Sequence, residues 1–205
     1  MKQILILSAL AFGLSFASAC SSATETTTAN KTATTNTTAA NTAANNTANA
    51  NKADDTPAAI KAVFPDAQSF TTQHKDVPAD KIASIEKDTS SKVPDKDHHS
   101  YLAFSTAGGA RKQIGAATIV KAGGKDVVIV YDNKDGSPVI KEIRTDGVPA
   151  PFLAQFAGKG HDNDLLLGAD IKASGANEAQ AKAITEAVRV DVLTMQALYG
   201  AAHKH

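Results

Sequence analysis

The sequence predicts an α+β domain in which an antiparallel β-meander of about four strands is packed by N-terminal and C-terminal helices. Two observations lead to this prediction. Four short apolar runs follow one another between residues 101 and 143, and turns containing glycine separate them. Patterns typical of helices lie before and after these runs. Because the strands come in one block, the pattern favours an antiparallel sheet over a parallel βαβ arrangement.

Two helices are expected ahead of the strands. The first, at 56–64, begins with Thr56 followed by Pro57, a pair typical of a helix start with proline at the first helical position. The second is expected at 78–88, where two isoleucines lie three positions apart on its inner face. The polar and charged residues 92–99 are expected to form a mobile loop.

The four strands are expected at 101–104, 113–121, 127–131 and 139–143. Glycine-containing turns follow each of the first three strands, and a further Asp-Gly pair ends the fourth. After two prolines, a short helix is expected at 152–156.

A long amphipathic helix is expected to begin after Asn177. One apolar stripe runs along it at intervals of four, four, three and four residues, through Ile184, Val188, Val192, Met195 and Tyr199. Asn177 can cap the first turn, and Gln180 three residues later can reach back to it. A glycine-containing turn at a helix N-terminus also suits an anion such as a phosphate. The local sequence alone leaves both interpretations open, a simple cap or an anion site.

The N-terminus divides into an export signal and a tether. Residues 1–19 contain a lysine, an apolar run and small residues before Cys20, which is the only cysteine of the chain. This arrangement resembles the lipobox of bacterial lipoproteins, which implies that Cys20 carries lipid. The resemblance implies a cell-envelope protein, lipid-anchored at the outer membrane and facing the periplasm or the surface. The alternative is an ordinary secreted protein with a free thiol.

Residues 20–55 are expected to be a disordered tether, and residues 56–205 the folded domain. Between positions 26 and 51 every residue except Lys31 is Thr, Ala or Asn, so no side chain can build a core. The net charge of the chain is zero, with no tryptophan and three tyrosines, so neither a basic field nor stacking platforms indicate a nucleic-acid partner.

The order of short motifs in the folded part resembles the FMN-binding domain family, which includes periplasmic flavin subunits of bacterial ion-translocating redox complexes. The resemblance covers roughly residues 58–199 and rests on Phe64-Pro-Asp-Ala67, Ile114-Gly-Ala116, Lys134-Asp-Gly136, Val139-Ile140, Phe152-Leu-Ala-Gln-Phe-Ala-Gly-Lys159, Ser174-Gly-Ala176 and Ala187-Val-Arg189.

The resemblance implies that FMN would contact Ser174, Gly175, Ala176 and Asn177. In the family a threonine at the last of these positions holds FMN through a phosphoester bond, whereas Asn177 has no hydroxyl to form it. Glu178 also places a carboxylate where it would repel a phosphate. The expectation is therefore an envelope lipoprotein that carries electrons through non-covalent FMN and a redox partner protein. The alternative is a flavin-free binding or structural module that keeps only the fold.

The remaining residues indicate no other chemistry. The histidines at 74, 98, 99, 161, 203 and 205 have no carboxylate or second histidine at a recognised ligand spacing, so no metal site is expected. A single cysteine excludes a cysteine cluster within one chain. No catalytic residue set is recognisable, so the chain is expected to be at most an electron-transfer protein.

Overall fold

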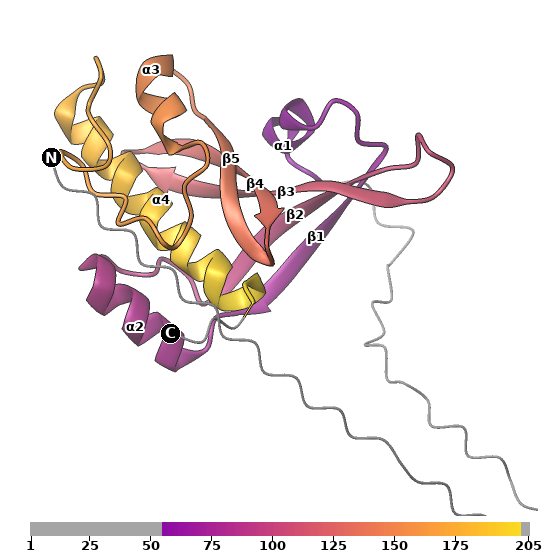
Figure 1. Cartoon of the computed structure of the whole chain (residues 1–205), viewed down its shortest axis with the longest axis horizontal. Coiled ribbons are helices and arrows are strands. Elements are labelled where there is room, and N and C mark those ends of the chain that lie inside the picture. The colour runs from indigo at the N-terminus through magenta and orange to yellow at the C-terminus, as the bar shows by residue number, and fades with distance from the viewer. Residues whose placement is uncertain (1–54, 202–205) are drawn as a thin grey trace, which may run out of the picture. The chain divides into compact units, whose positions relative to one another are not determined.

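The structure, a computed structural model, describes residues 55–201 of the chain (Figure 1). The predicted signal at 1–19, the lipid-attachment residue Cys20 and the tether up to residue 54 lie outside the described residues. Among the described residues, no helix combines the length and the apolar character that crossing a membrane requires.

The described part contains an antiparallel sheet, which confirms the α+β class and the meander. Its strands follow in sequence order and are β1 (Ser69–Asp76), β2 (Asp97–Ser105), β3 (Lys112–Ala122), β4 (Lys125–Lys134) and β5 (Ser137–Arg144). The expected count of about four strands was wrong, because the sheet has five. The missed strand is β1. It lies at the sheet edge, and no residue in it is fully buried, so its sequence lacks the apolar pattern of a strand.

The helices lie close to the expected positions. They are α1 (Ala58–Val63), α2 (Ala79–Thr89), α3 (Ala150–Leu153), the short 3-10 helix η1 (Ala154–Phe156) and α4 (Glu178–Tyr199). The cap of α4 is confirmed, since the side chain of Asn177 accepts hydrogen bonds from the amides of Ala179 and Gln180.

Two apolar clusters lie on opposite faces of the sheet. On one face, α3 and α4 pack against alternate residues of β4 and β5, including Ile129 and Ile140. On the other face, α1 packs against the intervening residues, including Val128 and Val130. This alternation explains why β4 is apolar without interruption: consecutive side chains enter different clusters.

The sheet opens between β2 and β3. These strands pair from Tyr101 with Ala117 to Ser105 with Lys112, and the pairing does not extend to the first four residues of β2. Those four residues still pair with β1, while the far end of β3 pairs with β4. The two halves of the sheet therefore diverge, as Figure 1 shows where β1 and β2 leave β3. Residues 97–99, expected in a loop, belong to β2.

Candidate metal centre

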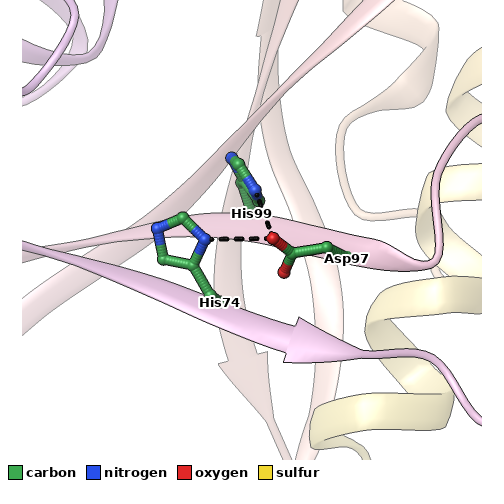
Figure 2. A group of neighbouring side chains, drawn as sticks. All are labelled: His74, Asp97 and His99. Carbon is green, nitrogen blue, oxygen red and sulfur yellow. Dashed lines mark hydrogen bonds and ion pairs between the residues drawn. The ribbon is translucent and has the colours of Figure 1, made fainter.

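His74, Asp97 and His99 converge on one face of the paired strands β1 and β2 (Figure 2). His74 and His99 are cross-strand partners in the antiparallel ladder, so their side chains project from the same face. Asp97 lies two residues before His99 on β2 and shares that face because side chains alternate along a strand. The register between β1 and β2 therefore brings two imidazoles and a carboxylate together.

The donor atoms of the three side chains lie within 4.8 Å of one another. Asp97 Oδ2 is 3.2 Å from His74 Nδ1 and 2.9 Å from His99 Nε2. Because an ionised carboxylate can only accept, each imidazole nitrogen donates its hydrogen to Asp97. The two rings lie against each other with centroids 4.1 Å apart. The hydrogen bonds from His99 and then His74 hold the pKa of Asp97 below its ordinary value, which favours its charged form.

This set of atoms suits a divalent transition-metal ion. Two imidazole nitrogens and one carboxylate oxygen are ligands that zinc, nickel and copper(II) accept, at about 2.0–2.2 Å from the ion for zinc. In a tetrahedral site with such bonds, neighbouring donor atoms lie about 3.4 Å apart. The two separations from Asp97 are close to that value, so an ion could replace the two shared hydrogens with small side-chain movements. The three side chains are about half exposed, so an ion can reach them.

The sequence did not reveal this group, because His74 lies on the strand that was missed. Without β1 there is no register that brings position 74 beside position 99. One signal was present in the sequence: Asp97 and His99 have the i, i+2 spacing that places both on one face of a strand.

His98, between two members of this group, points to the opposite face of β2 and contacts α4. Its Nε2 lies 3.0 Å from Oδ1 of Asp191, and the other oxygen of Asp191 accepts hydrogen bonds from the hydroxyls of Thr118 at 2.6 Å and Tyr131 at 2.7 Å. Asp191 is only 4% exposed. Burial, followed by the charge of Asp191, raises the pKa of Tyr131 well above its ordinary value, so its hydroxyl remains a donor. This network fixes β2 to α4.

The residues expected to contact FMN lie together in the turn before α4. Ser174 and Gly175 have positive φ values of 43° and 85°, and the amide of Ala176 bonds the carbonyl of Ala173 at 2.8 Å. The side-chain amide of Gln155 donates to Oγ of Ser174 at 3.0 Å.

The first-turn amides that a phosphate would use have an acceptor of their own. Asn177 Oδ1 lies 3.0 Å from the amide nitrogen of Ala179 and 3.4 Å from that of Gln180. The arrangement is a helix N-cap that occupies two of the first-turn amides.

A cavity of about 570 Å³ lies at the other end of α4, lined by Met195 and Tyr199 of that helix together with residues of β1 to β5. The helix has 22 residues, which corresponds to a length of roughly 33 Å. The cavity is therefore not placed to receive a ligand whose phosphate lies at Asn177.

No family model, no curated protein and no solved structure matches the chain. The resemblance to FMN-binding domains thus rests on the sequence motifs alone.

Proposed function

We propose that this chain is an envelope-tethered, flavin-free binding module whose ligand is a divalent transition-metal ion held by His74, Asp97 and His99. The observation that carries the proposal is the convergence of three potential metal-ligating atoms within 4.8 Å on the paired strands β1 and β2. Protein sites made of two imidazoles and a carboxylate are typical of zinc and related ions.

Two features favour the flavin-free alternative over a non-covalent FMN carrier. The cap at Asn177 already satisfies the amides of Ala179 and Gln180, so a phosphate would have to displace it. Glu178, in the first turn of α4, adds a negative charge at the same place. Both features weaken the anion site that the motif resemblance implies.

The envelope part of the proposal rests on the sequence. Residues 1–19 and Cys20 are typical of an exported lipoprotein, and a tether at 20–55 would let the domain move at a distance from the membrane. An exposed metal site on such a domain would meet ions dissolved in the compartment that surrounds it.

Titration calorimetry with Zn²⁺ tests the metal site. The chain from residue 20 is used with Cys20→Ser, His203→Ala and His205→Ala, so that neither the thiol nor the terminal histidines contribute. We expect one ion per chain. His74→Ala and His99→Ala should each weaken binding at least tenfold, because two donors hold an ion far less well than three.

His161→Ala is the matched control, since it removes a histidine from another part of the chain. It should leave zinc affinity unchanged, and circular dichroism should show that all variants are folded. Equal zinc affinity of the parent, His74→Ala and His99→Ala proteins would exclude this site.

A further inference from the structure

A cavity of about 460 Å³ adjoins the proposed metal site. It occupies the opening between β2 and β3, where the ladder ends at the pair Tyr101 and Ala117. Asp97 and His99 both contribute to its wall, so the cavity and the metal cluster share two residues. Its volume falls within the range of about 300–1,000 Å³ that is usual for small-molecule sites.

The wall of the cavity is largely apolar. It is formed from β2, β3 and α4, through Tyr101, Ile119, Val120, Ala187 and Val190. These side chains would contact the body of an organic molecule and remove it from water, which is the usual driving force for binding in such sites.

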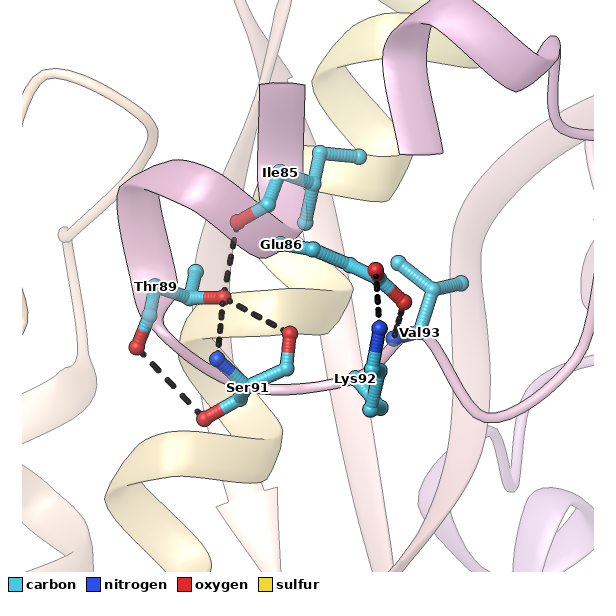
Figure 3. Close-up of polar contacts among 6 residues, drawn as sticks. All are labelled: Ile85, Glu86, Thr89, Ser91, Lys92 and Val93. Atoms are coloured by element: carbon cyan, nitrogen blue, oxygen red, sulfur yellow. Dashed lines mark hydrogen bonds and ion pairs between the residues drawn. The ribbon is translucent and has the colours of Figure 1, made fainter. Parts of the chain in front are cut away.

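The loop from α2 to β2 closes one side of the cavity, and hydrogen bonds hold this loop against α2 (Figure 3). The carboxylate of Glu86 accepts from Lys92 Nζ at 2.7 Å and from the amide of Val93 at 3.2 Å. The hydroxyl of Thr89 accepts from the amide of Ser91 at 3.2 Å. The wall is thus built in advance of any ligand, which lowers the entropic cost of binding.

An ion held by three protein ligands keeps coordination positions open. A four-coordinate ion has one such position, and an ion that expands its coordination has two, which a bidentate ligand can fill. Because two of the three protein ligands belong to the cavity wall, an exogenous ligand on the ion would extend its body into the cavity.

The charges around the cavity limit what this ligand can be. Lys92 and Lys121 each form an ion pair with a carboxylate that is not part of the wall, and Glu186 of the wall pairs with Lys182 outside it, so Asp95 leaves negative charge beside the cavity. A ligand with several negative groups would be repelled. A single anionic group would be neutralised on the metal ion.

We infer that the cavity and the metal ion form one site for a small organic molecule with a single bidentate, metal-binding group and a ring-sized apolar body. This inference rests on the proposed function, since the metal ion supplies the polar half of the site. The apolar body would lie against Ile119 and Val190.

Two hydroxamic acids that share one metal-binding group test the inference. Benzohydroxamic acid carries a phenyl ring and acetohydroxamic acid a methyl group, and each is titrated into the zinc-loaded chain. We expect the phenyl compound to bind at least tenfold more tightly, because its five additional carbon atoms leave water in the cavity. Equal affinities, or extraction of the zinc without a ternary complex, would overturn the inference.

Ile119→Thr reduces the apolar wall while keeping a β-branched residue on β3, and should bring the affinity ratio of the two compounds towards one. Ile114→Thr, on the same strand but outside this cavity, is the control and should keep the ratio. Zinc affinity is measured on both variants and should be unchanged. A chain that binds no zinc would contradict the proposed function itself, whereas zinc binding without a phenyl preference contradicts only the cavity.

Discussion

The imidazole of His98 and the carboxylate of Asp191 lie 3.0 Å apart and join the second strand of the sheet to the middle of α4. His98 is the residue between Asp97 and His99. Its contact on one face of β2 therefore fixes the strand that presents two of the proposed metal ligands on the other face. Asp191 is almost completely buried, and its oxygens accept from three side chains. The pair is therefore central to both the packing and the proposed site.

Replacing Asp191 by alanine should lower the free energy of unfolding by about 3 kcal/mol, because three buried donors lose their acceptor together. Urea denaturation measures the change.

In a double-mutant cycle, Asp191→Ala and His98→Ala should be non-additive by about 1 kcal/mol or more, since the two side chains interact directly. Glu186→Ala, an exposed acidic residue of the same helix, should change stability by less than about 0.5 kcal/mol. Additive effects would contradict the coupling.

Alkaline pH should destabilise the fold through Tyr131. Burial and the neighbouring Asp191 raise its pKa in the folded state, whereas an unfolded tyrosine ionises near pH 10. The folded state then keeps the proton after the unfolded state has lost it. The contribution of Tyr131 to the free energy of unfolding is complete below about pH 10. It is lost as the pH rises further, by at most about 1.4 kcal/mol per pH unit.

Urea titrations at pH 9, 10 and 11 test this dependence. Tyr131→Phe should be less stable at neutral pH, because a hydrogen bond to Asp191 is lost, but its stability should fall less steeply above pH 10. Tyr101→Phe is the control and should keep the steeper slope. Identical slopes for the parent and Tyr131→Phe proteins would exclude Tyr131 as the source.

The parts of the fold that bury apolar side chains could be predicted from the sequence. Strands β3 to β5 and helix α4 have the periodicity that burial on the sheet or helix face requires. β1 could not, since an edge strand with exposed side chains has no apolar alternation, and its pairing with β2 depends on contacts distant in sequence. The metal cluster was missed for the same reason.

The buried network could have been predicted in part. Asp191 lies three residues after Val188 and four before Met195, which places a carboxylate on the apolar stripe of α4. A charged residue in such a position needs buried partners. The identities of those partners, Thr118 and Tyr131, follow only from the packing of α4 on the sheet.

Cys20→Ser should release the chain from the membrane fraction into the soluble fraction, because lipid on Cys20 would be the remaining anchor once the signal is removed. Fractionation of cells followed by immunoblotting measures the distribution. Ser21→Ala, at the neighbouring position, should leave the chain with the membranes. A Cys20→Ser chain that loses its signal and still sediments with membranes would exclude the lipoprotein interpretation.

The cap of α4 has a structural role that can be separated from a role in flavin binding. Asn177→Ala should lower the free energy of unfolding by about 1 kcal/mol, since the amides of Ala179 and Gln180 lose their acceptor. Asn177→Thr should stay close to the parent, because threonine is also a competent cap. Thermal or urea denaturation measures both changes.

The same proteins are precipitated with acid after purification from a flavin-replete host, and the pellet absorbance is recorded. The parent chain should carry no acid-stable flavin, because an amide cannot form the phosphoester bond.

Asn177→Thr combined with Glu178→Ser restores a hydroxyl and removes the repelling carboxylate, so this variant is expressed with a flavin transferase. Because the cavity near Met195 lies at the far end of α4 and the cap needs no ligand, we expect this variant to stay colourless as well. Acid-stable flavin on the variant would show that the turn at Ser174 still forms a flavin site and would favour the electron carrier over the flavin-free module.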